Sequence, residues 1–336
     1  MPLPFAINGL GRIGRALLRV AREREGLELV AVNDLGTPAQ LAPLIARDTL
    51  HGRFSGTVEA VDDALLLDGR RIPASQEEQA SELDWGGAEP EVVIDATGHC
   101  KTRELAAEHL RGGVGRVLVS ANARGLDLTI CMGVNHAAYD PVRHRLLSAA
   151  SCTTNALVPL LWVLEREFGV EHALLNTVHS YNNDQRLLSF PHPDPRRARE
   201  AAVNMIPTTT SAVEAAILIL PRLEGRLDGL AVRVPTANVS LIDLVAALRG
   251  QPSVDELHHA FRRAETGDLA GILGTSDEPL VSSDYMSDPR SAVVDLPLTQ
   301  QVDRRLYRVV AWYDNEWGHA SRLADVLEWI HRGHDA

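Results

Sequence analysis

The sequence predicts an α/β protein of two domains, the first built on a parallel sheet covered by helices and the second an α+β domain with a mostly antiparallel sheet. Three observations predict it. The 336 residues exceed what one small core usually holds. The first 150 residues alternate short apolar runs with amphipathic stretches, as β-α units do. After that point the apolar runs lengthen. We place the first domain at 1–150 and the second at 151–314, with a closing helix in 315–336 that packs back on the first.

The elements of the first domain follow from the period of their apolar residues. Short runs rich in Val, Ile and Leu predict strands, whereas leucines spaced among arginines predict a helix. We expect strands at 5–7, 27–32, 91–95, 116–120 and 128–132, and a helix at 15–23.

The second domain opens with a helix, expected at 157–168, and closes with one at 321–331. Between them, longer runs predict strands at 173–179, 230–234, 239–248 and 306–313. The stretch 180–199 is polar and punctuated by Pro191, Pro193 and Pro195. A loop of this length in a compact domain is usually functional or interfacial.

Composition excludes several classes of function. No apolar run approaches the roughly 20 residues that span a bilayer, and the start lacks a secretory pattern, so we expect neither membrane insertion nor secretion. Three scattered cysteines favour a reducing cytoplasm and show no zinc spacing, so no metal is expected. The net charge of −12 argues against nucleic-acid binding.

A glycine pattern near the start predicts a dinucleotide site. Gly9-Leu-Gly11-Arg-Ile-Gly14 follows a strand and opens a helix, as in a Rossmann domain. Asp34 ends the next strand, about 20 residues further on, where a carboxylate accepts hydrogen bonds from the adenosine ribose. Because that carboxylate repels a 2′-phosphate, NAD is favoured over NADP. The alternative is a structural turn followed by a solvated Asp34.

A cysteine and a histidine are candidates for catalysis. Cys152 lies at or just before the start of an apolar helix, where exposed N–H groups stabilise a thiolate. Thr153, Thr154 and Asn155 are capping types, so a capped helix with an inert thiol is equally compatible. His179 ends a predicted strand beside the long loop, but a lone histidine is more often structural.

The chain resembles the glyceraldehyde-3-phosphate dehydrogenase family. The matching stretches occur in family order over nearly the whole chain, and the Cys152–His179 spacing is also the family's. They begin at Ile7 (INGLGRIGR), Ala150 (ASCTTN), Thr177 (TVHSY), Asp184 (DQRLL), Arg196 (RRAR), Ile206 (IPTTT), Ala231 (AVRVPTANVS) and Trp312 (WYDNEWG).

The resemblance implies an NAD-dependent enzyme that oxidises glyceraldehyde 3-phosphate to 1,3-bisphosphoglycerate. Cys152 would be the nucleophile that carries a thioester, and His179 the general base. Inorganic phosphate would attack the thioester. By the same resemblance, the protein would be a cytoplasmic, glycolytic homotetramer in which the loop around Pro191 reaches a neighbouring subunit.

Binding residues are carried over one by one. The NAD contacts implied are Gly9, Gly11, Arg12, Ile13, Gly14, Asp34, Ser120 and Asn315. The substrate or phosphate contacts implied are Ser151, Thr153, Asn182, Arg197, Thr210, Ser211 and Arg233. Arg233 lies in an apolar strand, where a cation needs a partner such as a phosphate or a buried carboxylate. Arg197 is favoured over Arg196 and Arg199, although the three could form a solvated basic patch.

The chain departs from the family pattern at four places. Asn182 replaces a common Thr that helps hold the substrate phosphate, and its amide donates with a different reach. His319 replaces a Tyr, Glu78 replaces an Arg near the adenine, and Ala96 replaces a Ser.

Other functions are possible from the sequence. Erythrose-4-phosphate dehydrogenase, giving 4-phosphoerythronate, is the close alternative, because Asn182 and His192-Pro193-Asp194 resemble that sibling. Asp34 and Thr208–Ser211 favour glyceraldehyde 3-phosphate. A semialdehyde dehydrogenase is disfavoured by Thr210 and Arg233. A non-catalytic NAD-binding protein is disfavoured by the intact Cys152/His179 pair.

Overall fold

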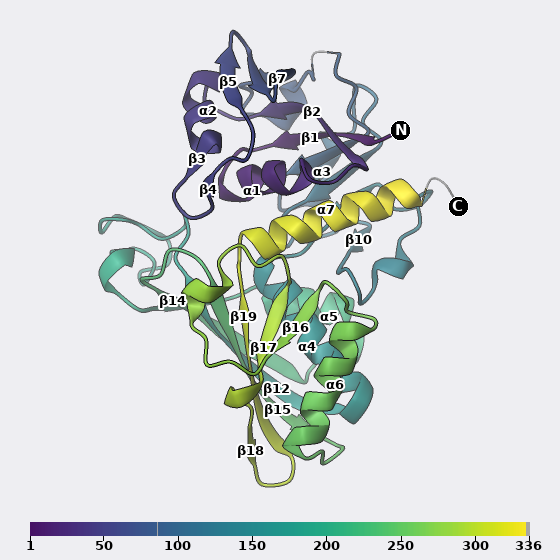
Figure 1. Cartoon of the computed structure of the whole chain (residues 1–336), viewed down its shortest axis with the longest axis vertical. Helices are drawn as coiled ribbons and strands as arrows, with labels where there is room; N and C mark the ends of the chain where they lie inside the picture. The colour runs from purple at the N-terminus through teal and green to yellow at the C-terminus, as the bar shows by residue number, and fades with distance from the viewer. Residues whose placement is uncertain (86, 334–336) are drawn as a thin grey trace. The chain divides into compact units, whose positions relative to one another are not determined.

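The computed structural model describes residues 1–85 and 87–333. The chain divides into two compact units, which Figure 1 shows with their helices and strands labelled. The first unit holds Met1–Ser151 together with a C-terminal segment that begins at Ala320. The second unit holds Cys152–His319.

The described part of the first unit contains a nine-stranded sheet in the order β10-β11-β9-β8-β1-β2-β7-β6-β5. From β10 to β7 all neighbours are parallel, which confirms the expected parallel sheet. The pairs β7–β6 and β6–β5 are antiparallel, and these three strands are not among the expected elements. The strands are β1 (Leu3–Asn8), β2 (Leu27–Asn33), β5 (Val58–Val61), β6 (Ala64–Leu67), β7 (Arg70–Ser75), β8 (Val92–Asp95), β9 (Arg116–Val119), β10 (Leu128–Thr129) and β11 (Leu146–Ser148).

The helices of this unit connect its parallel strands. They are α1 (Arg12–Ala21), α2 (Pro38–Ala46) and α3 (Arg103–Ala107), and β3 (Arg47–Asp48) and β4 (Gly52–Arg53) form a small ladder. Helix α1 begins earlier than expected because Gly11 already serves as its N-cap. Helix α2 was not expected; a capping box between Thr37 and Gln40 starts it.

The C-terminal helix α7 (Trp317–Arg332) begins in the second unit, and its part from Ala320 onward belongs to the first. Arg24 tethers this part by pairing with Asp325 at 3.1 Å and with Glu328 at 3.4 Å. Helix α7 covers the closing helix expected at 321–331 and starts a few residues earlier.

The second unit is built on an eight-stranded sheet, counted over its described residues, in the order β13-β14-β12-β15-β19-β17-β16 with β18 beside β19. The pairs β12–β14 and β16–β17 are parallel and the others antiparallel, which confirms a mostly antiparallel sheet. The strands are β12 (Val170–Ser180), β13 (Ile206–Thr208), β14 (Leu227–Val234), β15 (Ser240–Leu248), β16 (Leu273–Ser276), β17 (Ala292–Asp295), β18 (Gln300–Val302) and β19 (Leu306–Tyr313).

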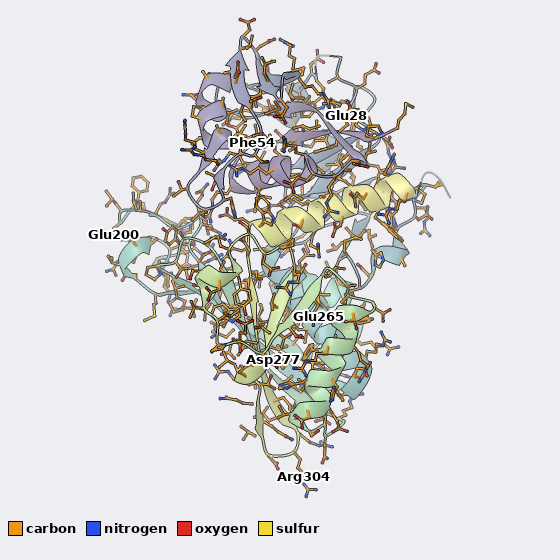
Figure 2. The ribbon with its side chains drawn as sticks, viewed as in Figure 1. Glu28, Phe54, Glu200, Glu265, Asp277 and Arg304 are labelled. Atoms are coloured by element: carbon orange, nitrogen blue, oxygen red, sulfur yellow. The ribbon has the colours of Figure 1, made fainter. Side chains whose placement is uncertain are left out.

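Helices α4 (Cys152–Phe168), α5 (Ala212–Ile219) and α6 (Val254–Thr266) gather on one side of this sheet (Figure 1). Strand β15 alternates buried and half-buried residues, so that Ile242, Leu244 and Ala246 form part of the core. At the far end of the unit, β18 and β19 form a hairpin whose exposed turn carries Arg304 (Figure 2). Among the described residues, no helix combines the length and apolarity that crossing a membrane requires.

Candidate active site

A cavity of about 650 Å³ opens in the first unit where β1, β2 and β8 end. Three of the residues predicted to bind the cofactor line it, namely Gly9, Gly11 and Asp34. Because parallel strands present their carboxyl ends at one edge, such an edge is where α/β sheets bind nucleotides.

At two of its three glycines, the turn beside this cavity has no room for a side chain. Gly9 has a φ of +95°, and a Cβ there would lie 2.9 Å from the backbone nitrogen of Thr97. A Cβ at Gly14 would lie 2.0 Å from the Gly9 carbonyl oxygen. The turn therefore presents bare backbone to the cavity and packs closely on α1, which fits the pyrophosphate of a dinucleotide.

The carboxylate of Asp34 is held in place by the main chain around it. Its Oδ2 accepts a hydrogen bond from Leu10 N at 2.7 Å, and its Oδ1 accepts one from Gly36 N at 2.8 Å. Asp34 is therefore tied to the glycine turn and presents a fixed negative charge to the cavity, which suits ribose hydroxyls and disfavours a 2′-phosphate.

A buried polar network beneath the cavity was not predicted. Asn33 Nδ2 donates to Asn8 Oδ1 at 2.8 Å, and Asn8 Nδ2 donates to Asp95 Oδ2 at 2.9 Å. His109 Nε2 lies 3.1 Å from the same Asp95 oxygen. Burial alone would raise the pKa of Asp95, but hydrogen bonds from His109 and Thr97 outweigh it and keep that pKa below its ordinary value.

The second unit brings the two predicted catalytic residues together. Cys152 is the first residue of α4, and its Sγ lies 3.6 Å from His179 Nε2. His179 is buried near the end of β12, whereas Cys152 is partly exposed. Because the first N–H groups of a helix lack partners within it, the sulfur lies among potential donors. Ala150, with a φ of +57°, turns the chain just before this helix.

Two contacts at Nδ1 of His179 bear on its tautomer. Nδ1 lies 2.6 Å from the carbonyl oxygen of Ser180, which can only accept, so this contact favours the Nδ1–H tautomer with the Nε2 lone pair toward the thiol. Arg233 stands opposite His179 in the β12–β14 ladder. Its Nη1 contacts the imidazole Nδ1 and donates to the same carbonyl at 3.2 Å. A hydrogen bond from Arg233 to Nδ1 would require the opposite tautomer. In the Nδ1–H tautomer, the imidazole can accept a proton from the cysteine side.

The surroundings of the Cys152 thiol act on its pKa in both directions. Burial raises its pKa above the ordinary value, and this effect outweighs the Arg233 charge and the hydrogen bonds from Thr153, which act in the opposite direction. Deprotonation therefore depends on a base, and His179 is the base within reach.

Tyr313 contacts residues on both sides of the Cys152–His179 pair, and it was not among the predicted site residues. Its hydroxyl lies 3.0 Å from that of Thr153 and 2.9 Å from that of Thr177, and its ring meets the His179 ring edge-on. The hydroxyl of Thr153, which we expected to contact substrate, is thus engaged inside the protein. Whether Thr153 also contacts substrate stays a prediction.

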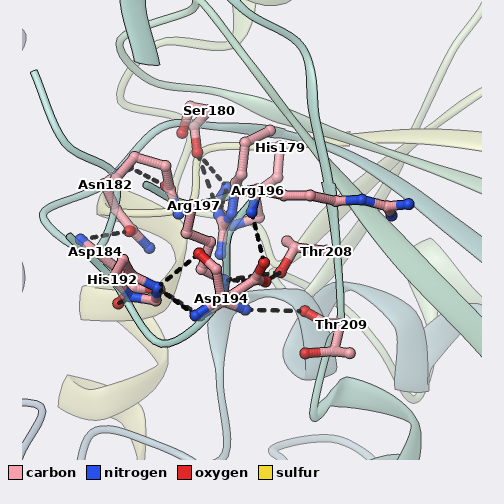
Figure 3. A network of polar contacts seen from close by, with 12 residues as sticks. His179, Ser180, Asn182, Asp184, His192, Asp194, Arg196, Arg197, Thr208 and Thr209 are labelled. Carbon is pink, nitrogen blue, oxygen red and sulfur yellow. Dashed lines mark hydrogen bonds and ion pairs between the residues drawn. The ribbon is translucent and has the colours of Figure 1, made fainter. Parts of the chain in front are cut away.

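Arg197 lies in a network of ion pairs (Figure 3). Its Nε donates to Thr208 Oγ1 at 2.7 Å and lies 3.5 Å from Asp194 Oδ2, and its Nη1 pairs with Asp184. The exposed side chain of Arg196 extends away from this network. The guanidinium of Arg197 is thus already paired with carboxylates, and its contact with a substrate phosphate stays a prediction.

The other predicted phosphate contacts lie at turns and helix ends. Ser211 is the exposed N-cap of α5, and Thr210 Oγ1 accepts from Ala212 N at 3.2 Å. Asn182 Oδ1 accepts from Asp184 N at 3.0 Å, which leaves its amide nitrogen as the available donor. Ser151 immediately precedes α4. These roles stay predictions.

The remaining predicted cofactor residues are distributed over both units. Arg12 and Ile13 open α1, and Ser120 follows β9. Asn315 lies in the second unit between β19 and α7 and is buried. Of the departures, Glu78 and Ala96 line the cavity and His319 is buried. Among the described residues, no group of three or more His, Cys, Asp and Glu is arranged to hold a metal ion.

Comparisons with known proteins agree with this geometry. A family model described as glyceraldehyde 3-phosphate dehydrogenase, NAD binding domain, matches residues 3–103. The model for the C-terminal domain of the same family matches 151–315. A glyceraldehyde-3-phosphate dehydrogenase of Kitasatospora aureofaciens is 48% identical over 325 residues, covering 96% of this chain and 98% of its own. One from Geobacillus stearothermophilus is 45% identical over 330 residues, covering 98% of both chains.

Proposed function

Because the chain belongs to the glyceraldehyde-3-phosphate dehydrogenase family, we propose that it oxidises glyceraldehyde 3-phosphate with NAD and inorganic phosphate to give 1,3-bisphosphoglycerate. The observation that carries this proposal is the Cys152–His179 pair, with Sγ 3.6 Å from Nε2 and Arg233 behind the imidazole. The protein is thus an NAD-dependent oxidoreductase.

The proposed chemistry begins at Cys152. Its sulfur attacks the aldehyde carbon while His179 Nε2 takes the thiol proton, and a thiohemiacetal forms. Backbone N–H groups at the start of α4 stabilise the oxygen. The protonated His179 returns its proton to that oxygen, which completes the hydroxyl of the thiohemiacetal. His179 then removes the hydroxyl proton as a hydride leaves the carbon, and the thioester forms. Phosphate attack on the thioester carbonyl releases the acyl phosphate and returns the thiol.

The cofactor fits the first unit, whose cavity has a side-chain-free glycine turn and a fixed Asp34 carboxylate. When bound, NAD supplies a hydride acceptor. We propose that Gly9, Gly11, Arg12, Ile13, Gly14, Asp34 and Ser120 hold its adenosine and pyrophosphate part, and that Asn315 orients the nicotinamide. In these terms the first unit is the NAD-binding domain and the second is the catalytic domain.

We assign anion binding to the polar side chains around the cysteine. Arg233 has a buried Nε for which the described residues offer no partner, and burial lowers its pKa without removing its charge at neutral pH. A substrate phosphate would satisfy such a group. Arg197, Thr210, Ser211, Ser151, Thr153 and Asn182 complete the proposed set.

The alternative substrate, erythrose 4-phosphate, is not favoured. The relatives named above and one from Bacillus subtilis, 44% identical over 98% of this chain, are named for glyceraldehyde 3-phosphate. Asn182 remains a departure, but it keeps a donor at the position of the usual Thr.

Steady-state rates with both phosphorylated aldehydes, with and without phosphate, test the proposal. We expect glyceraldehyde 3-phosphate to have the higher kcat/KM and NADH formation to require phosphate beyond a first turnover. Cys152→Ala should form no NADH and still bind NAD, whereas Cys131→Ala serves as a control on a buried thiol. Phosphate-independent turnover with a preference for the four-carbon aldehyde would overturn the assignment.

We also propose a homotetramer in the cytoplasm. The loop after β12 exposes Leu187, Leu188 and Phe190, at 77%, 70% and 62%, and such a cluster favours burial against another subunit. All three cysteines are free thiols, which suits a reducing compartment. Sedimentation equilibrium tests the assembly, and a monomer at micromolar concentration would contradict it.

A further inference from the structure

Three strand ends meet around the amide of Asn315. Strand β12 ends at Ser180, the antiparallel β15 begins at Ser240, and β19 ends at Tyr313, which pairs with Ser240. Asn315 follows two residues later. Ser180, Ser240 and Asn315 are all buried, with 0%, 2% and 6% of their surface exposed.

Two serine hydroxyls converge on one atom of this amide. Ser180 Oγ and Ser240 Oγ each lie 2.9 Å from Asn315 Oδ1. Ser240 Oγ also accepts from the backbone N–H of Ser180 at 3.1 Å, so its own proton is free to point at Oδ1. Both hydroxyls therefore donate to the carbonyl oxygen of the amide.

This arrangement assigns the direction of the amide. If the group turned over, Nδ2 would face both serines and two buried hydroxyl protons would lose their acceptor, which is unfavourable. The serines thus hold Nδ2 on the opposite side, as a donor. The carboxylate of Asp314 fixes the main chain here, since it accepts from Glu316 N at 2.9 Å and from Trp317 N at 2.8 Å.

We propose that Ser180 and Ser240 are positioning residues that lock Asn315 Nδ2 as a hydrogen-bond donor for the carboxamide oxygen of the nicotinamide. The inference rests on the proposed NAD-dependent function. Ser180 takes part twice, because its hydroxyl holds Asn315 and its carbonyl oxygen lies 2.6 Å from Nδ1 of His179. One residue therefore positions the proposed nicotinamide donor and also contacts the proposed base.

Calorimetric titration of the full-length protein with NAD and with ADP-ribose tests this inference without any need for turnover. ADP-ribose lacks the nicotinamide. Ser180→Ala should weaken NAD binding about two- to tenfold, the range for one lost hydrogen bond, and leave ADP-ribose binding unchanged. Ser240→Ala should do the same, and Ser240→Thr, which keeps a hydroxyl, should restore it. Thionicotinamide adenine dinucleotide carries a sulfur in place of the carboxamide oxygen, and this sulfur accepts hydrogen bonds poorly. Its affinity should therefore differ little between Ser180→Ala and the wild type.

Ser291→Ala is the matched control, because Ser291 is 3% exposed and its hydroxyl has no partner among the described residues. It should bind both ligands as the wild type does. Unchanged NAD affinity in both Ser180→Ala and Ser240→Ala would overturn the inference, as would an equal loss for ADP-ribose. If Asn315→Ala alone weakens NAD binding, the proposed function stands and only the serine role fails. A wild type that binds neither ligand would overturn both.

Discussion

The hydroxyl of Tyr313 lies 3.0 Å from the hydroxyl of Thr153 and so joins the end of β19 to the first turn of α4. The same hydroxyl lies 2.9 Å from that of Thr177 on β12. One phenol thus connects the strand that carries His179 to the helix that begins with Cys152.

Tyr313→Phe should therefore lower both stability and turnover. The change leaves two buried threonine hydroxyls short of a partner, so the free energy of unfolding should fall by about 1–3 kcal/mol. Urea denaturation and kcat measure the two effects. Tyr285→Phe is the control, because Tyr285 is as buried as Tyr313 but its hydroxyl contacts neither threonine, so kcat should not change. Equal effects of the two changes would contradict this role.

Alkylation of Cys152 should accelerate with pH and depend on Arg233. Burial raises the thiol pKa and the Arg233 charge lowers it, so Arg233→Gln should move the pH midpoint of reaction with neutral iodoacetamide upward. Below the pKa, the rate should rise about tenfold per pH unit, as the thiolate fraction does. Arg196→Gln, at an exposed arginine, should leave the midpoint in place.

The same experiment should modify one cysteine only. Cys100 and Cys131 are 5% and 1% exposed, and burial raises the pKa of each to about 12. Peptide mass spectrometry after brief exposure at neutral pH would then locate the label at Cys152. Label on Cys131 before Cys152 would count against the assignment of the reactive thiol.

Asn182→Thr should lower the KM for the aldehyde. A threonine at this position would present a short hydroxyl where Asn182 presents an amide whose oxygen is already bonded to Asp184 N. We expect a decrease of about threefold, on the scale of one improved hydrogen bond, with the KM for NAD unchanged. Asn183→Thr changes the exposed neighbour and is the control. An unaltered KM would mean that Asn182 does not touch substrate.

Asp34→Asn should admit NADP. Removing the charge next to the ribose site removes its repulsion of a 2′-phosphate, and NADP affinity should rise about tenfold. NAD affinity should fall, because the neutral amide has only one oxygen for the bonds from Leu10 N and Gly36 N. Fluorescence titration with both cofactors measures the ratio. Glu59→Gln, at an exposed carboxylate on β5, should not alter it.

Much of this fold can be predicted because the sequence patterns span the same few residues as the interactions that form each strand or turn. The period of apolar residues predicts β1, β2, β8 and β9, and the glycine turn predicts the start of the cofactor cavity. The antiparallel strands β5–β7 were missed for two reasons. Strand β5 is largely exposed, and β6 is a run of four apolar residues too short for its period to distinguish a strand from a helix. Strand β10 is shorter than expected because Asn135 Oδ1 accepts from Cys131 N and bends the chain there.

The polar support of the site was harder to predict, since it depends on which distant residues meet. The signal in the first unit was present: Asn8, Asn33 and Asp95 each end a strand, and they are neighbours in register. Tyr313 gave no such sign, because a tyrosine at the end of an apolar strand is compatible with ordinary core packing. The raised pKa of Cys152 was also hidden, since the helix start is visible in the sequence and the burial is not.

The register between β12 and β14 limits where residues can be inserted into the chain or deleted from it. His179 stands opposite Arg233, and Thr177 stands opposite Ala231. A single inserted or deleted residue within either strand would turn one of these side chains to the other face of the sheet. The β18–β19 hairpin, whose exposed turn includes Asp303 and Arg304, aligns no such pair. Tolerance of insertions should therefore be confined to places such as this turn, while the strand that carries the base keeps its residue count.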